Sequence, residues 1–147
     1  MHFMDIDETN WRLPLKVSKE QERYVAGSTA ILARAYAYRN VRSRAFFVCE
    51  GETPVGMGLY YDCDPLHAYD FSQLFIDERF QGKGYGRAAA LLALDFMRKD
   101  GKYDKVVLCY IQGNEAAKNL YESCGFAEVG REEEEIVMEL HLSACRN

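Results

Sequence analysis

Three glycines at alternate positions stand out in the stretch QGKGYGR, residues 81–87. An apolar run precedes this stretch and a helical run follows it, so it joins the end of a strand to the start of a helix. The first turn of a helix leaves backbone N–H groups unpaired and carries positive partial charge, and it therefore binds phosphate groups well. Glycine lets such a backbone approach an anion without an intervening Cβ. The stretch predicts a phosphate or pyrophosphate site, although a turn that only connects two elements could have the same composition.

Two common phosphate-binding loops do not match this stretch. The P-loop requires G-x-x-x-x-G-K-[ST], which is missing. The dinucleotide fingerprint G-x-G-x-x-G fails because alanines follow Gly84 and Gly86. The pattern that fits is Gln/Arg-x-x-Gly-x-Gly/Ala, with Gln81 in its first position. Here the chain resembles the GNAT superfamily of acetyl-CoA-dependent N-acetyltransferases.

A second block, NEAAKNLYESCGF at residues 114–126, supports this resemblance independently. It is similar to the family pattern N-x-x-A-x-x-[LF]-Y-x-x-x-G-F. The matching positions are Asn114, Ala117, Leu120, Tyr121, Gly125 and Phe126. The two blocks lie in the expected order, and the order of predicted elements agrees over nearly the whole chain.

The resemblance implies acetyl-CoA as co-substrate and assigns residues to it. The strand before the glycine loop would offer its backbone to the pantetheine arm at Leu74, Phe75 and Ile76. Asn114 would lie near the thiol end of the cofactor. The residues expected around the pyrophosphate follow Gln81 and are Gly82, Lys83, Gly84, Tyr85, Gly86 and Arg87.

Acetyl transfer to an amine requires a neutral amine, a polarised thioester carbonyl and protonation of the leaving thiolate. Tyr121 is the predicted acid, because helical spacing places it on one face with Leu120 and Cys124, and the resemblance gives it the role of protonating the sulfur. A tyrosine that only packs in the core is the alternative. The strand amide near Phe75 or Ile76 is the expected carbonyl polariser.

The general base is left open by the sequence. Many relatives carry a strand glutamate where this chain has Ser72. Asp70 lies two residues earlier and, by strand alternation, on the same face. It could deprotonate the amine through water or attract its cationic form, or it could be a solvated strand end.

The acceptor is expected to be a small primary amine, with a polyamine such as spermidine or spermine as the first hypothesis. The segment of residues 13–38 is similar to bacterial spermine/spermidine acetyltransferases, and Tyr24 and Tyr36 could flank an aliphatic amine. Acidic side chains would suit a polycation if they converge on the groove. The candidates are Glu20, Glu22, Asp62, Asp64 and Asp70.

Other functions stay open at this stage. The acceptor could be a peptide N-terminus, a lysine or an aminoglycoside. A non-catalytic acyl-CoA-binding sensor would keep the same fold without turnover, although the presence of Tyr121 argues against it. A dinucleotide-binding domain is a third alternative that no other part of the chain supports.

Composition narrows the class of protein. The chain has 147 residues, typical of one domain, which we assign to residues 1–147, and its formal charge of −5 disfavours nucleic acid. The first residues lack the pattern of a signal peptide, and the apolar runs are too short to cross a membrane. Five cysteines without a C-x-x-C pair favour a reducing cytoplasm and argue against a metal site. The resemblance also implies a homodimer as one assembly.

The elements that must position these residues form a mixed α/β fold, with a mostly antiparallel sheet flanked by helices in a single GNAT-like domain. A capping box of Ser18 and Gln21 predicts the first helix, and Ser28 is expected to cap the second. A long helix after the glycine loop is expected to bury Ala89, Leu92, Ala93 and Phe96 on one face. The expected helices are 19–27, 28–40, the long helix to about 100, and 114–125. The expected strands are 45–51, 54–62, 69–77, 103–112, and a hairpin of 126–130 and 134–142.

Overall fold

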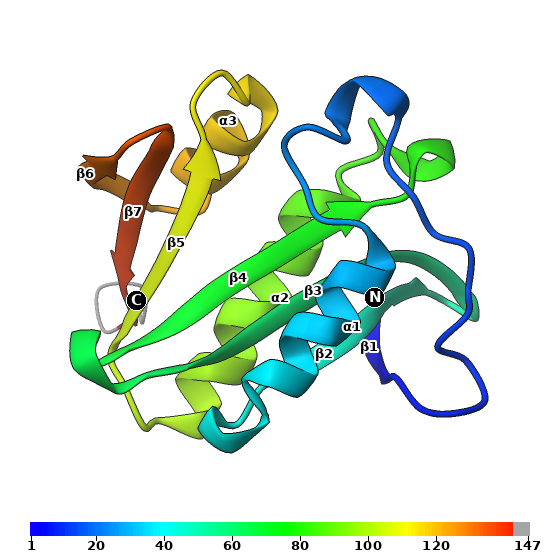
Figure 1. The fold of residues 1–147 in the computed structure, drawn as a ribbon, viewed down its shortest axis with the longest axis horizontal. Helices are drawn as coiled ribbons and strands as arrows, with labels where there is room; N and C mark the ends of the chain where they lie inside the picture. The colour runs from blue at the N-terminus through cyan, green and yellow to red at the C-terminus, as the bar shows by residue number, and fades with distance from the viewer. Residues whose placement is uncertain (143–147) are drawn as a thin grey trace.

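The computed structural model describes residues 1–142, which form one seven-stranded sheet with helices on both faces (Figure 1). The sheet order is β1-β2-β3-β4-β5-β7-β6, and only β4 and β5 run parallel. The strands are β1 (His2–Asp5), β2 (Arg44–Glu50), β3 (Thr53–Cys63), β4 (Ala68–Ile76), β5 (Lys105–Ile111), β6 (Ala127–Glu132) and β7 (Glu135–His141). Cys145 and residues 143–147 of the predicted domain lie outside the described residues.

Three α-helices cover the sheet: α1 (Ser28–Ala37), α2 (Tyr85–Asp100) and α3 (Glu115–Ser123). Helix α1 lies in front of the sheet in Figure 1 and α2 lies behind it. The front core joins Ile31 of α1 to Met57 and Leu59 of β3. The rear core joins Ala93 and Met97 of α2 to the strands and to α3. The predicted fold class, a mixed and mostly antiparallel sheet between helices, is confirmed.

Strands β4 and β5 diverge, and this divergence shapes the site. They pair at only two positions, Tyr69 with Val106 and Asp70 with Val107. Beyond Asp70 the strands separate, as Figure 1 shows. The edge of β4 that faces β5 therefore has unpaired backbone groups from Phe71 onward.

The first predicted helix, over residues 19–27, is wrong. The chain forms only a short 3₁₀ helix at Lys19–Gln21, and the Ser18 hydroxyl contacts the Gln21 side chain rather than a backbone amide. Val25 and Ala26 pack against the front core instead of continuing a helix. Contacts with the sheet thus override the local capping signal.

The second helix begins and ends close to its predicted limits, but its cap differs. Gly27 occupies the N-cap position, and Ser28 is the first helical residue. A 3₁₀ turn at Arg39–Val41 replaces the last residues of the predicted helix 28–40.

Strand β1 was not expected from the sequence. Its four residues pair antiparallel with β2, and the Phe3 ring stacks on Phe46 with 3.9 Å between centroids. So short a strand carries almost no periodicity of its own. Its partner, distant in sequence, stabilises it.

The predicted buried face of α2 is partly wrong. Ala89 and Ala93 are buried as expected, but Leu92 is only half-buried and Phe96 is exposed. The buried face instead consists of Ala89, Ala90, Ala93, Leu94 and Met97. Small alanine side chains let the helix lie close to the sheet, while Phe96 packs at the rim beneath the Arg44 guanidinium. No helix among residues 1–142 is long and apolar enough to span a membrane.

Candidate active site

A cavity of about 580 Å³ opens where β4 and β5 diverge. Its walls come from β4, the glycine loop, β5, α3 and the segment before α1. Most predicted site residues line it: Leu74, Phe75, Ile76, Gln81, Gly82, Gly84, Tyr85, Gly86, Asn114 and Tyr121. Three predicted residues do not line it: Lys83, Arg87 and Asp70.

The glycine loop owes its shape to backbone conformations that other residues rarely adopt. Gly82 and Gly84 have φ of +80° and +82°. The Gln81 amide donates to the backbone oxygen of Ile76 at 2.9 Å and to the Gln21 side chain at 2.8 Å. These bonds tie the loop to the end of β4 and to the segment before α1.

The start of α2 presents free backbone donors at this loop. Ala88 is the first residue whose amide bonds back along the helix, to the Gly84 oxygen at 3.1 Å, so the three preceding amides lack helical acceptors. A Cβ on Gly86 would meet its nearest neighbour, the Ile76 side chain, at 3.7 Å, which is ordinary contact. Packing therefore does not require glycine at this position. The bare backbone fits an anion such as a pyrophosphate.

The edge of β4 fits an extended amide-bearing arm. Leu59 pairs with Gln73 and Tyr60 with Phe71, which leaves Ser72 as an unpaired bulge residue. Because β5 has already diverged, the adjoining edge can pair with a ligand as it would with another strand. The pantetheine arm of coenzyme A carries amides that suit such an edge. Together, this edge and the loop fit the two parts of the cofactor expected from the sequence.

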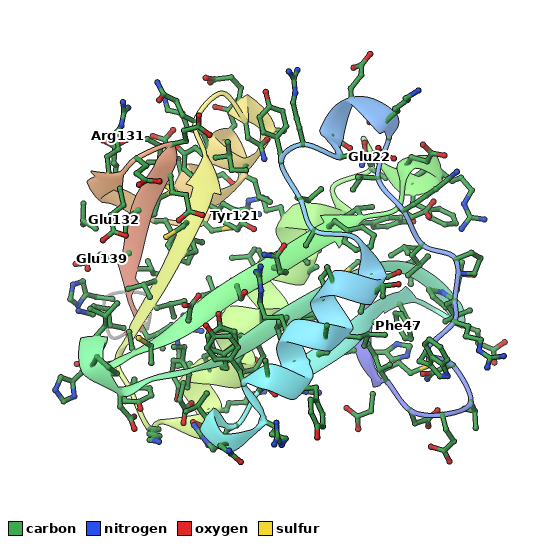
Figure 2. All side chains as sticks on the ribbon, viewed as in Figure 1. Glu22, Phe47, Tyr121, Arg131, Glu132 and Glu139 are labelled. Carbon is green, nitrogen blue, oxygen red and sulfur yellow. The ribbon has the colours of Figure 1, made fainter. Side chains whose placement is uncertain are left out.

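Tyr121 projects from α3 into the cavity wall; Figure 2 shows it beside β5. Its ring contacts Phe71 and Phe126 edge-on, at 6.2 Å and 5.7 Å between centroids. Burial raises the pKa of its phenol, which therefore stays protonated at neutral pH. Among residues 1–142 its hydroxyl has no hydrogen-bond partner, so its proton is free for a ligand.

Asn114 begins α3 as its N-cap. Its side-chain oxygen accepts from the Ala117 amide at 3.2 Å. The same side chain lines the cavity. Its amide nitrogen has no protein partner among the described residues.

Asp70 is the last residue of β4 that pairs with β5, where these two strands separate. Burial raises the pKa of its carboxyl to about 6, the positive charge of Arg34 opposes this shift, and Glu135 reinforces it. Asp70 is not among the residues that line the cavity. A group there could act on a ligand through water.

Sequence reasoning missed Arg34 and Glu135, both of which line the cavity. Arg34 donates to the Ser72 hydroxyl at 3.2 Å. One signal could have revealed it: Arg34 follows the buried Ile31 by three residues, so a charge lies on the apolar face of α1. Glu135 comes from β7, far away in the sequence, within the predicted strand 134–142.

None of the five acidic candidates lines the cavity, and Asp70 alone lies on β4 where β4 and β5 separate, so the predicted convergence of acidic residues on the groove is wrong. Asp62 accepts from Arg42 at 2.7 Å and from Lys102 at 2.8 Å, and Asp64 lies 3.7 Å from Lys102. Glu20 and Glu22 are exposed and do not line the cavity, and Glu22 lies well apart from Tyr121 in Figure 2. Asp62 belongs to the end of β3 rather than to the predicted loop, and Asp64 to the turn that follows; lysine and arginine partners account for both charges.

One tyrosine and one cysteine also contribute to the cavity wall. Tyr24 lines the cavity as expected, whereas Tyr36 is 68% exposed and lies outside it. Cys109 also lines the cavity, and burial together with Glu135 and Asp70 raises the pKa of its thiol to about 11. It is therefore protonated and weakly nucleophilic at neutral pH.

Residues 1–142 contain no cluster of histidine, cysteine and acidic side chains that could hold a metal ion.

The cavity fits a cofactor that carries a pyrophosphate and an amide-bearing arm, and comparison with known proteins identifies the family. The model of the acetyltransferase (GNAT) family matches residues 4–126. The chain therefore belongs to the GNAT family, whose members are N-acetyltransferases that use acetyl-CoA as co-substrate. The predicted enzyme class and co-substrate are confirmed. The search of curated proteins returned no match.

Solved structures share the fold at low sequence identity. Spermidine N-acetyltransferase from Vibrio cholerae, in complex with CoA and spermine, has a TM-score of 0.77 and 22% identity, covering 99% of this chain and 98% of that chain. A dodecameric structure of the same enzyme has a TM-score of 0.73 and 21% identity, covering 99% and 96%. The ribosomal-protein-S18-alanine N-acetyltransferase from Escherichia coli has a TM-score of 0.71 and 19% identity, covering 96% and 93%.

Proposed function

We propose that this protein transfers the acetyl group of acetyl-CoA to a primary amine by direct attack within a ternary complex. One observation carries the proposal: the glycine loop, the free edge of β4 and Tyr121 all line one cavity. A cofactor anchored at the loop and extended along β4 would bring its reactive end toward α3. The acetyltransferase domain would extend beyond the matched region, because β7 pairs with β5 in the same sheet.

Acetyl-CoA supplies an activated acetyl thioester. The loop amides would hold its pyrophosphate, and the amide of Phe75 or Ile76 would polarise the carbonyl. Lys83 and Arg87 lie outside the cavity lining, so they would act only through long-range charge.

Two side chains would move the protons. Asp70 first accepts a proton from the ammonium through water, which frees the lone pair of the amine nitrogen. That lone pair forms the bond to the acetyl carbon while the carbon–sulfur bond breaks, and Tyr121 donates its phenolic proton to the departing sulfur. The acetylated nitrogen then loses a second proton, which restores the Tyr121 phenol, so each turnover converts an ammonium and a thioester into an amide, a thiol and one released proton.

Cys109 supports direct attack over an acetyl-enzyme route. It is the thiol among the cavity-lining residues, and its pKa of about 11 keeps it protonated at neutral pH. A thiol in that form is a poor acceptor of an acetyl group.

The kind of amine, the cellular location and the assembly of the protein are also proposals. The carboxylates of Asp70 and Glu135 and the shared fold of the solved spermidine acetyltransferases favour a polyamine acceptor, whereas the positive charge of Arg34 in the cavity lining opposes one. A cytoplasmic location is supported by the unpaired cysteines. A homodimer that forms by pairing of C-terminal strands would use the edge of β6, because β7 is enclosed between β5 and β6.

The test is coenzyme A release from acetyl-CoA in the presence of primary amines, with the N-acetyl product identified by mass spectrometry. Amine-dependent release is the expected result. Tight acetyl-CoA binding without release for any amine would instead favour the sensor that binds acyl-CoA without turnover.

A further inference from the structure

The acceptor end of the cavity contains a cation that the protein itself does not neutralise. Arg34 lines the cavity from α1, and its guanidinium donates to the neutral Ser72 hydroxyl at 3.2 Å. Among residues 1–142 it forms no ion pair. Since arginine stays protonated at any physiological pH, this charge and its remaining N–H donors are available to a ligand.

The pyrophosphate of the cofactor is too far away to be that ligand. Ser72 precedes Ile76 by four residues along β4, and the glycine loop begins only after Ile76. Four residues of strand span about 13 Å. Arg34 therefore belongs to the acceptor end of the cavity.

Two carboxylates belong to the same region. Glu135 lines the cavity with Arg34, and Asp70 interacts electrostatically with both, because Arg34 lowers the pKa of Asp70 and Glu135 raises it. The acceptor end thus presents one positive group beside two negative ones. This arrangement complements a zwitterion, whereas a polyamine would bring only positive charges toward Arg34.

We propose, building on the proposed function, that the acceptor is a free amino acid or another small amine that carries a carboxylate. The carboxylate binds the guanidinium fork of Arg34 together with the Ser72 hydroxyl, and the amine lies on the side of Asp70. Arginine suits this role because its planar fork matches the two oxygens of a carboxylate.

The test uses matched pairs of amines that differ only in a carboxylate: lysine with cadaverine, ornithine with putrescine, and γ-aminobutyrate with n-propylamine. Coenzyme A release is measured with each, and spermidine is included. In at least one pair, the carboxylate-bearing amine should have a kcat/KM at least about tenfold higher than its partner. The amine without a carboxylate cannot form the charge-assisted bidentate contact with Arg34.

The Arg34→Gln variant should remove this preference by raising KM for the amino acid while leaving KM for acetyl-CoA unchanged. Arg34→Lys should restore part of it, because the charge returns without the fork. The matched control is Arg39→Gln, since Arg39 is exposed, stacks over Tyr36 at 4.2 Å and lies outside the cavity. Thermal melting confirms that each variant is folded.

Equal or better turnover of the amines without a carboxylate, or an unchanged preference in Arg34→Gln, would overturn the inference while the proposed function stands. If no amine is acetylated, the proposed function fails and the inference falls with it.

Discussion

The two ends of the cavity are built in different ways. At the cofactor end, backbone groups of the glycine loop and of β4 face the cavity. At the acceptor end, the charges come from side chains of three separate elements: Arg34 from α1, Asp70 from β4 and Glu135 from β7. Backbone recognition requires particular local conformations, so it leaves a compact pattern in the sequence. Recognition by side chains from distant segments leaves no such pattern.

Removing the carboxylate of Asp70 should produce the largest change at the acceptor end. Asp70→Asn is expected to lower kcat by about 100-fold, the usual contribution of a positioned base. In the wild type, the rate should fall additionally below about pH 6, where the carboxyl becomes protonated. Steady-state rates between pH 5 and 9 test this prediction. The fall in rate that protonation of Asp70 causes below about pH 6 should be missing from the variant. An Asp70→Asn enzyme with wild-type kcat would remove Asp70 from the mechanism.

The same variant should be more stable than the wild type. The raised pKa of Asp70 means that the folded protein holds a proton that the unfolded chain releases between about pH 4 and pH 6. The free energy of unfolding therefore declines as pH rises through this window. Above it, the ionised Asp70 carboxyl destabilises the folded protein by the full amount. Asp70→Asn should gain about 1–3 kcal/mol of unfolding free energy at pH 8 and little at pH 4. Lower stability at pH 8, measured by urea denaturation, would indicate a structural role.

A smaller change is expected at the cofactor end from Gly86→Ala. The added methyl meets only ordinary contacts with Ile76 and Leu120, so the fold should persist. It occupies space beside the anion site, and we expect acetyl-CoA affinity to fall about tenfold, the effect of losing about 1.4 kcal/mol of binding free energy.

The matched control for Gly86→Ala is Gly130→Ala, because Gly130 has open space around it and lies on β6 outside the cavity. Isothermal titration with acetyl-CoA compares the two variants. Equal affinities would mean that the cofactor does not approach the backbone at Gly86.

The smallest effect on turnover is expected from an arginine that is fully paired. Arg42 donates to Asp62 and Asp100, and Asp62 is almost completely buried. Arg42→Gln should lower the unfolding free energy by about 1–3 kcal/mol, because a buried carboxylate loses one of its two cationic partners. The kcat should stay within about twofold, since the site is at the far end of the sheet. Loss of turnover in a folded Arg42→Gln protein would contradict the separation of the two ends.

Most of the fold and the cofactor end could be predicted from the sequence. The glycine loop and the block around Tyr121 are short, and their residues act as neighbours in the chain, so their spacing carries the information. Strand β1 could not be predicted, because His2–Asp5 acquires its conformation by pairing with β2.

The acceptor end was predicted less well because its residues come from distant segments. Asp62 carries the same charge as Asp70, but Arg42 and Lys102 engage it at the far end of the sheet. Conversely, Arg34 has the sequence context of an ordinary helical residue, and its place in the cavity depends on β4, whose Ser72 it contacts. Which charges are compensated within the protein is a property of the tertiary structure.

The most direct test of amine acetylation in this cavity is to compare Tyr121→Phe with the wild type for both acetyl-CoA affinity and coenzyme A release. The substitution removes one hydroxyl and leaves the ring contacts with Phe71 and Phe126. We predict an unchanged affinity for acetyl-CoA and a kcat reduced by at least about 100-fold, as expected for loss of a general acid. Unchanged turnover in the variant would contradict the assignment of Tyr121 as the acid.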